Sequence, residues 1–188
     1  MLGALRALNG LNDVLREDDN LLLYYAGHGY YDEDVDLGYW LPVDADLESK
    51  RNWIRNSTIT DTIKGMQAKH VLLVADSCFS GTLLRSVDVK RTGRFYEQMA
   101  RRSARLVMTS GGIEPVMDGG GDGHSVFARS FIEKLRGGER IVACTSLFQA
   151  IREPVVMSSE QVPQYSNIRF IDSDGGDFLF VRRAADQG

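Results

Sequence analysis

Apolar and polar residues follow one another along this chain in two patterns, one typical of buried strands and the other of helices. Short apolar runs at 21–26, 71–74 and 104–109 end in small or polar residues, as strands buried inside a parallel sheet do. Apolar residues three or four positions apart predict helices, which lie near residues 2–15, 58–67, 124–135 and 145–153. This order of elements predicts an α/β domain with a mostly parallel sheet.

The other segments are predicted to be loops and edge strands. Residues 30–36 form an acidic loop, and Pro42 keeps the extended segment 38–43 out of the middle of a sheet. Residues 82–103 are the most basic part of the chain, where we expect a long surface connection without regular structure. Residues 161–177 are predicted to be a loop, and 178–181 a last strand.

Two residues are expected to set the limits of the helix after residue 144. Thr145 has a side chain suited to capping a helix N-terminus, and Pro154 lacks the backbone N–H that a helix interior needs. We therefore expect this helix to begin at Thr145 and to end near Pro154.

The composition excludes several classes of protein. The chain has 188 residues, which suits one domain, and its net charge of -4 gives no basic footprint for nucleic acid. Its apolar runs are far shorter than the roughly 20 residues of a membrane span, and the first segment is too polar for a signal peptide. Two cysteines, Cys78 and Cys144, do not make a disulfide framework, so we expect a reduced, cytoplasmic location.

Residues with reactive side chains follow two of the predicted strands. The sequence GHG places His28 after the strand at 21–26, and DSCFSG places Cys78 after the strand at 71–74. If these strands are parallel neighbours, His28 and Cys78 emerge at the same edge of the sheet. A cysteine nucleophile needs a proton acceptor, which His28 supplies, and donors for an oxyanion, which the N–H groups of Gly29 and Cys78 supply. The alternatives are a buried structural cysteine and a turn histidine.

The remaining candidates carry less chemistry. We expect Cys144 to be a core residue, and His70 and His124 to be structural or surface residues. The glycine-rich loop at 118–123 lacks the Lys-Ser/Thr of a phosphate-binding loop. Two cysteines and three scattered histidines form no zinc pattern, so no zinc site is predicted.

Taken together, these motifs resemble those of the caspase-like cysteine peptidases of the metacaspase and bacterial orthocaspase type. YYAGHG and DSCFSG place His28 and Cys78 fifty residues apart, close to the separation in caspases. Further stretches resemble bacterial members: YWLPVDA, LVMTSGGIEPVMDGG, GHSVFARSFIEKL, and QVPQYS leading to GDFLFV. The resemblance covers nearly the whole chain.

The resemblance implies a fold and an activity. The fold is a three-layer α-β-α sandwich with a mostly parallel central sheet, in a single domain over 1–188. It divides into a large-subunit-like part at 1–81, the basic connection at 82–103 and a small-subunit-like part at 104–188. The activity is that of a cysteine endopeptidase, a hydrolase with a His28 and Cys78 dyad and no required cofactor. The resemblance also suggests a role in regulated cell death or defence.

The resemblance also implies a preference for basic substrates. Asp76 would lie at the base of the pocket for the residue before the cut, where a carboxylate pairs best with Arg or Lys. The alternative role for Asp76 is to cap a turn. Glu114 is the nearest match to a second acidic residue of that pocket, and Pro115 follows it where metacaspases usually have a glutamine nearby. We therefore expect protein or peptide substrates with Arg or Lys before the cut, and neither a nucleic-acid nor a membrane partner.

The family also implies two further expectations, self-cleavage and calcium binding. Its members often cut themselves in the connection between their two parts, where this chain carries Arg85, Lys90, Arg91, Arg94, Arg101 and Arg102. Metacaspases often bind calcium, for which the acidic candidates are Asp32, Glu33, Asp34, Asp36, Asp44 and Asp46; they lack the EF-hand spacing, and a solvated acidic loop is the favoured interpretation.

Family members also begin with a strand, a helix and a strand that this sequence does not contain, so the fold is expected to be N-terminally incomplete. That would leave the strand at 21–26 unpaired on one side unless another chain supplies the missing strands. The alternative function is therefore a catalytically impaired caspase-like module that binds a regulatory partner.

Overall fold

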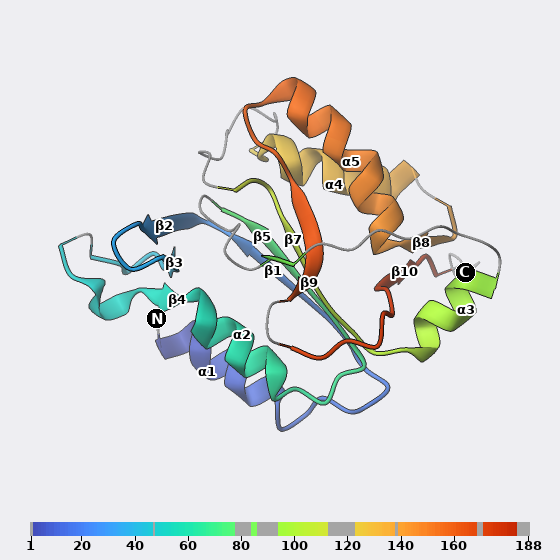
Figure 1. The fold of residues 1–188 in the computed structure, drawn as a ribbon, viewed down its shortest axis with the longest axis horizontal. Helices are drawn as coiled ribbons and strands as arrows, with labels where there is room; N and C mark the ends of the chain where they lie inside the picture. The colour runs from blue at the N-terminus through green and yellow to red at the C-terminus, as the bar shows by residue number, and fades with distance from the viewer. Residues whose placement is uncertain are drawn as a thin grey trace, which may run out of the picture.

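The computed structural model describes residues 2–46, 48–77, 84–85, 94–112, 123–137, 139–168 and 171–183. Its centre is a five-stranded sheet (Figure 1) in the order β1 (Asn20–Ala26), β5 (His70–Asp76), β7 (Ala104–Thr109), β9 (Gln164–Ile168) and β6 (Leu84–Arg85). The first three strands are parallel, whereas β9 runs antiparallel to both β7 and β6. The three predicted apolar strands and the mostly parallel sheet are confirmed.

Helices cover both faces of this sheet, which makes the predicted three-layer sandwich (Figure 1). α1 (Leu2–Leu11) and α2 (Asn56–Lys64) lie on one face, and α4 (Val126–Gly137) and α5 (Cys144–Ser158) lie on the other. Every residue of β5 is buried because its side chains alternate between the two layers. Leu73 belongs to the same core cluster as Ile63 of α2, and Leu72 to the same cluster as Phe127 of α4.

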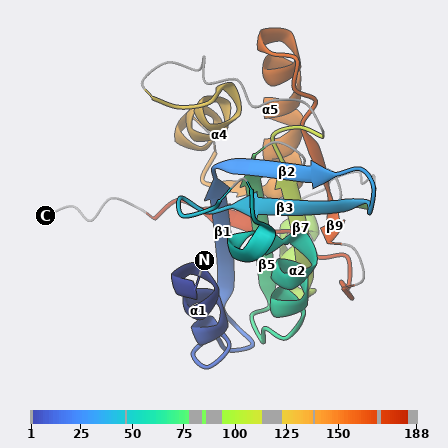
Figure 2. The same cartoon turned by 90° about the vertical axis from the view of Figure 1, so that its left-hand side faces the viewer.

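A second, smaller sheet follows β1. It contains β2 (His28–Asp32), β3 (Leu37–Leu41) and β4 (Ile54–Arg55), and Figure 2 shows it lying across one end of the central strands. The predicted acidic loop at 30–36 is therefore partly wrong, because β2 continues to Asp32 and pairs there with Leu37 of β3. Only the turn remains outside the strands, and Asp36 adopts a positive φ of 53° in it. A 3-10 turn, Lys50–Asn52, lies between β3 and β4.

The basic connection at 82–103 contains regular structure, contrary to the prediction. α3 (Arg94–Arg101) lies within it, and β6 pairs with β9. Met99 of α3 is buried in a small cluster with Ala143, against which Tyr96 and Leu179 pack. Gly93 and the mixed polarity of the segment, which contains five arginines, concealed the helical spacing of Tyr96 and Met99 in the sequence.

The segment 161–177 was also wrongly predicted to be a loop, because β9 lies within it. The sequence of β9, QYSNI, has no apolar run, and its place in the sheet depends on pairing with β7. The predicted last strand is confirmed as β10 (Leu179–Val181), which pairs with β8 (Ile141–Ala143) in a separate two-stranded sheet.

Both predicted limits of α5 are wrong. The cap position is Ala143, and the N–H of Thr145 donates to Oδ2 of Asp177 at 3.1 Å, so a distant carboxylate satisfies the helix start. Pro154 lies inside α5, which continues to Ser158. The carbonyl that Pro154 leaves without its helical donor belongs to exposed Ala150, where water can reach it.

Every helix in the described segments is too short or too polar to cross a bilayer.

Candidate active site

The ends of β1 and β5 meet at the carboxyl edge of the sheet. These neighbours pair in register from Asn20 opposite His70 to Ala26 opposite Asp76, and the N–H of Gly27 donates to the carbonyl of Asp76 at 3.4 Å. His28 and Cys78 each follow two residues after this last pair. Cys78 itself lies outside the described residues. The register therefore carries the chain on both strands to the same point, as expected for parallel neighbours.

The backbone at His28 is held by a tyrosine from β1. The hydroxyl of Tyr25 shares its proton between two carbonyl oxygens, that of His28 at 2.7 Å and that of Leu41 at 3.2 Å. The ring of Tyr25 stacks on Trp40 with centroids 4.1 Å apart. Burial raises the pKa of Tyr25 to about 12, so its hydroxyl stays protonated and remains a donor at neutral pH. The imidazole of His28 is exposed at the start of β2.

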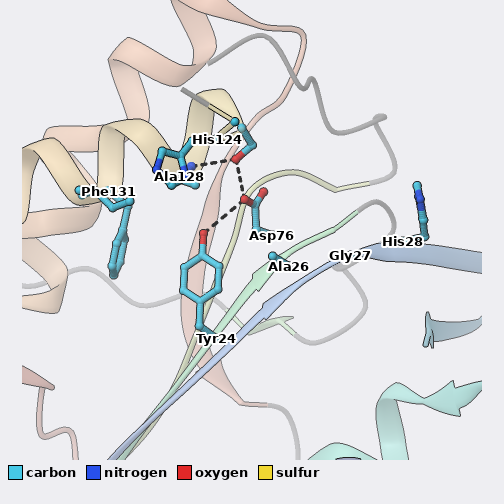
Figure 3. Close-up of a pocket in the computed structure, with 11 residues that line it drawn as sticks. Tyr24, Ala26, Gly27, His28, Asp76, His124, Ala128 and Phe131 are labelled. Atoms are coloured by element: carbon cyan, nitrogen blue, oxygen red, sulfur yellow. Dashed lines mark hydrogen bonds between the residues drawn. The ribbon is translucent and has the colours of Figure 1, made fainter. Parts of the chain in front are cut away.

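A cavity of about 580 Å³ lies beside these strand ends. His28 and Asp76 line it from the sheet, and His124, Ser125 and Phe131 line it from α4 and the residues just before that helix. Figure 3 shows Asp76 near the centre of this group, with His28 on one side and the α4 side chains on the other. The cavity thus lies between the ends of β1 and β5 on one side and the N-terminal part of α4 on the other.

Asp76 presents a buried carboxylate to this cavity. Its residue is only 4% exposed, and Oδ2 accepts hydrogen bonds from the hydroxyls of Ser125 at 2.5 Å and Tyr24 at 3.3 Å (Figure 3). These donors lie 49 and 52 residues away in the sequence, so Oδ2 binds across the fold rather than within its own turn. Burial, together with the charge and hydrogen bond of Asp76, raises the pKa of Tyr24 well above its usual value, which keeps the phenol protonated.

Gly29 and Cys144 are among the other residues singled out in the sequence that the structure describes. Gly29 is the second residue of β2, where it pairs with Trp40 of β3. Cys78 and Glu114 lie outside the described residues. Cys144 is fully buried, as expected, and burial raises the pKa of its thiol well above the usual value.

Three residues of the cavity were missed as functional candidates. Tyr24, His124 and Ser125 all line it. The one signal available for Ser125 was its place before a helical pattern, and its Oγ does accept the N–H of Ala128 at 2.9 Å as an N-terminal cap. Nothing in the sequence indicates that the same hydroxyl also reaches Asp76.

The acidic residues proposed for calcium are engaged elsewhere or scattered. Asp32 pairs with Lys50, which lowers the pKa of that carboxyl, and Asp36 accepts the hydroxyl of Tyr31. Within the described ranges, no three His, Cys, Asp or Glu side chains are grouped so as to hold a metal ion. These residues do not fit a shared calcium site, and no catalytic step is assigned to the metal.

The comparisons define the class of protein. A family model of the caspase domain, peptidase C14, matches residues 4–172. The chain belongs to this caspase-domain family, whose members are associated with cysteine peptidase activity.

Two solved structures share its fold. Protein GSU0716 from Geobacter sulfurreducens is 20% identical with a TM-score of 0.58, and the match covers 87% of this chain and 71% of that one. Caspase-1 from Spodoptera frugiperda is 14% identical with a TM-score of 0.57, covering 87% of this chain and 67% of that one. At these identities the likeness concerns the fold. None of the curated proteins compared with this chain gives a significant match.

Proposed function

We propose that this protein is a cysteine endopeptidase that uses Cys78 as nucleophile and His28 as its proton-transfer partner. The observation that supports this most strongly is the register of β1 and β5, which pairs Ala26 with Asp76 two residues before the histidine and the cysteine. Two strands that end together bring the residues beyond them to one edge of the sheet. Membership of the caspase-domain family supports the same chemistry.

In this mechanism the thiolate of Cys78 attacks the carbonyl carbon of the scissile bond. The N–H groups of Gly29 and Cys78 stabilise the negative oxygen of the tetrahedral intermediate. The imidazolium of His28 protonates the leaving amine, and a thioester remains on Cys78. His28 then takes a proton from water, whose oxygen attacks the thioester and releases the carboxylic acid and the Cys78 thiolate, which restores the starting thiolate and imidazolium pair.

The substrate preference follows from the charge in the cavity. Asp76 is the buried carboxylate there, and a buried negative charge is best compensated by a hydrogen-bonded cation. We infer cleavage after Arg or Lys, with Glu114 as the candidate for a second acid. Acidic side chains before the cut are repelled by the same carboxylate.

The first prediction concerns the dyad. Hydrolysis of a fluorogenic peptide ending in Arg should fall at least about a hundredfold in Cys78→Ala and in His28→Ala, because each change removes one half of the proton-transfer pair. The matching peptide ending in Asp should be a poor substrate of the unchanged protein. Activity should fall at low pH, because the protonated thiol of Cys78 is a much weaker nucleophile than the thiolate. A flat rate from pH 5 to 8, or turnover that survives Cys78→Ala, would argue against this dyad.

Self-processing is the second prediction. Arg94 and Arg101 lie within α3, and Arg85 lies in β6, so their backbones are already engaged in regular structure. Proteases cut extended, accessible backbone, which disfavours these three among the candidates. Intact-mass measurement after incubation should show fragments from this segment in the unchanged protein and none in Cys78→Ala. Equal amounts of the same fragments in both would assign the cut to another protease.

A catalytically impaired binding module is the second candidate. Among the described strands, β1 lies at the edge of the sheet, with Leu22 and Tyr24 each 41% exposed. An apolar edge strand can accept a strand from a partner. Absence of Cys78-dependent turnover with Arg and Lys peptides would favour this candidate over the peptidase.

A further inference from the structure

The carboxylate of Asp76 is held by hydroxyl groups from two other parts of the fold. Tyr24 projects from β1, and Ser125 precedes α4, yet both donate to the same oxygen, Oδ2. We propose that Tyr24 and Ser125 are positioning residues that set the orientation of the Asp76 carboxylate for a planar cationic group, and so determine the preference for arginine over lysine. This inference rests on the proposed function and deepens it.

The orientation of a carboxylate is not set by its own side chain. The terminal torsion of aspartate is broad, so the plane of the carboxyl group turns easily unless its oxygens are held. Donors from two separate elements restrict that rotation. Ser125 and Tyr24 therefore do more than compensate a buried charge, since they hold Oδ2 from two different elements.

The position of Ser125 is itself fixed. Its Oγ accepts the N–H of Ala128, which anchors it to the first turn of α4, while its proton goes to Asp76 at 2.5 Å. A hydroxyl can donate once and accept twice, so both bonds form together. Through Ser125, the N-terminus of α4 is connected directly to the carboxylate at the end of β5.

Tyr24 is 41% exposed, and its ring contacts α4 on one side. Its ring meets Phe131 of α4 edge to face, with centroids 6.0 Å apart. The Tyr24 hydroxyl donates from the neighbouring strand β1 to Asp76 at 3.3 Å. Tyr24→Phe would keep the ring contact and remove only the hydroxyl, which makes it a clean test.

A planar ligand is more sensitive to this orientation than a spherical one. The guanidinium of arginine forms two parallel hydrogen bonds to a carboxylate in one plane, whereas the ammonium of lysine acts as a point charge. Loss of either hydroxyl should therefore weaken arginine recognition more than lysine recognition. A purely structural role would weaken both equally.

The test compares matched Arg and Lys peptides in the full chain. In Tyr24→Phe and Ser125→Ala, KM for the Arg peptide should rise about tenfold, kcat should change less than about threefold, and KM for the Lys peptide should rise less. Ser125→Thr keeps a hydroxyl and should restore the Arg preference. Tyr31→Phe and Ser103→Ala are matched controls, since each removes a hydroxyl bonded to an aspartate outside this cavity, to Asp36 and Asp174. For both peptides, both control variants should have the same KM as the unchanged protein.

A binding measurement separates this proposal from the peptidase itself. Nα-acetylarginine amide is titrated into Cys78→Ala protein and followed by NMR, with and without Tyr24→Phe or Ser125→Ala. Weaker binding in these variants supports the proposal even if the unchanged protein hydrolyses nothing, an outcome that would refute only the proposed function.

Three results would overturn the inference. Normal hydrolysis of Arg peptides with unchanged KM in both variants would do so while leaving the proposed function intact. A loss of thermal stability and kcat with the same Arg-to-Lys preference would show a structural role only. Absence of any binding of the probe to Cys78→Ala protein would show that the cavity around Asp76 does not bind an arginine side chain.

Discussion

Gly27 connects β1 to His28 at a point where a side chain has no room. A Cβ at this position would lie 2.8 Å from the hydroxyl oxygen and 3.0 Å from Cζ of Tyr25. Tyr25 cannot move aside freely, because its ring stacks on Trp40 and its hydroxyl holds the carbonyl of His28. The absence of a side chain at Gly27 therefore leaves room for the Tyr25 hydroxyl to bond to the carbonyl of His28.

Gly27→Ala should reduce kcat/KM for an Arg peptide by about tenfold or more, because a clash of this kind typically costs about 1–3 kcal/mol and here displaces the support of His28. Steady-state kinetics on the purified variant measure this. Gly10→Ala is the matched control, since a Cβ there meets nothing within 4 Å. In helix α1 it should leave kcat/KM unchanged and stabilise the fold by up to about 1 kcal/mol. Equal kinetics in both variants would show that Tyr25 yields at no cost.

At the scale of elements, β5 connects the two cores to the active edge. It pairs with β1 on one side and β7 on the other, and all seven of its residues are buried. Alternation sends Leu72 toward α4 and α5 and Leu73 toward α1 and α2. The position of Asp76 at the end of β5 therefore depends on packing in both layers.

Leu72→Ala should lower the free energy of unfolding by about 2–5 kcal/mol, because it leaves a cavity in a core that both strands and helices surround. Urea denaturation followed by circular dichroism gives this value. Met157→Ala removes a side chain that is 80% exposed on α5 and should change stability by less than about 0.5 kcal/mol. A loss below about 1 kcal/mol for Leu72→Ala would mean that this layer can close around the gap.

At the scale of the whole molecule, the side chain of His70 at the start of β5 contacts the start of β1 and the end of α3, and so connects three segments of the chain. Its Nδ1 lies 2.6 Å from Oδ1 of Asn20 at the start of β1, and its Nε2 lies 2.9 Å and 3.2 Å from the carbonyls of Arg102 and Met99 at the end of α3. Burial lowers the pKa of His70, with smaller contributions from nearby positive charges. The histidine is thus a structural residue, one of the two roles expected from the sequence.

The lowered pKa of His70 makes stability depend on pH in one direction. The unfolded chain, with a histidine pKa of about 6.5, binds a proton more readily than the folded chain, so the contribution of His70 is complete above that pH and is lost as the pH falls below it. The free energy of unfolding should therefore decrease from pH 7 to pH 5. His70→Gln should be less stable at pH 7.5 by about 1–3 kcal/mol and should show a shallower pH dependence. Parallel curves for the two proteins, measured by urea denaturation at each pH, would exclude His70 as the source.

Local patterns in the sequence determined the main architecture and the proposed dyad. The apolar runs that became β5 and β7 are buried on both faces, so their composition alone marks them as inner strands, whereas the equally apolar β1 lies at the edge with every second residue exposed. The helical periodicities work for the same reason, since one face of each helix meets the sheet. The motifs around His28 and Cys78 follow directly from these runs, because each lies where an apolar strand ends.

Only the tertiary structure decided the features that join distant segments. β9 forms a strand because its backbone pairs with β7. The carboxylate of Asp177 accepts the N–H of Thr145 at the start of α5 because the fold brings these two residues together. The hydroxyls of Tyr24 and Ser125 reach Asp76 across 52 and 49 residues, a contact set by the register of β1 on β5 and by the placement of α4. Burial and periodicity are local properties that a sequence displays, whereas a hydrogen bond between polar side chains depends on where the folded chain places both of them.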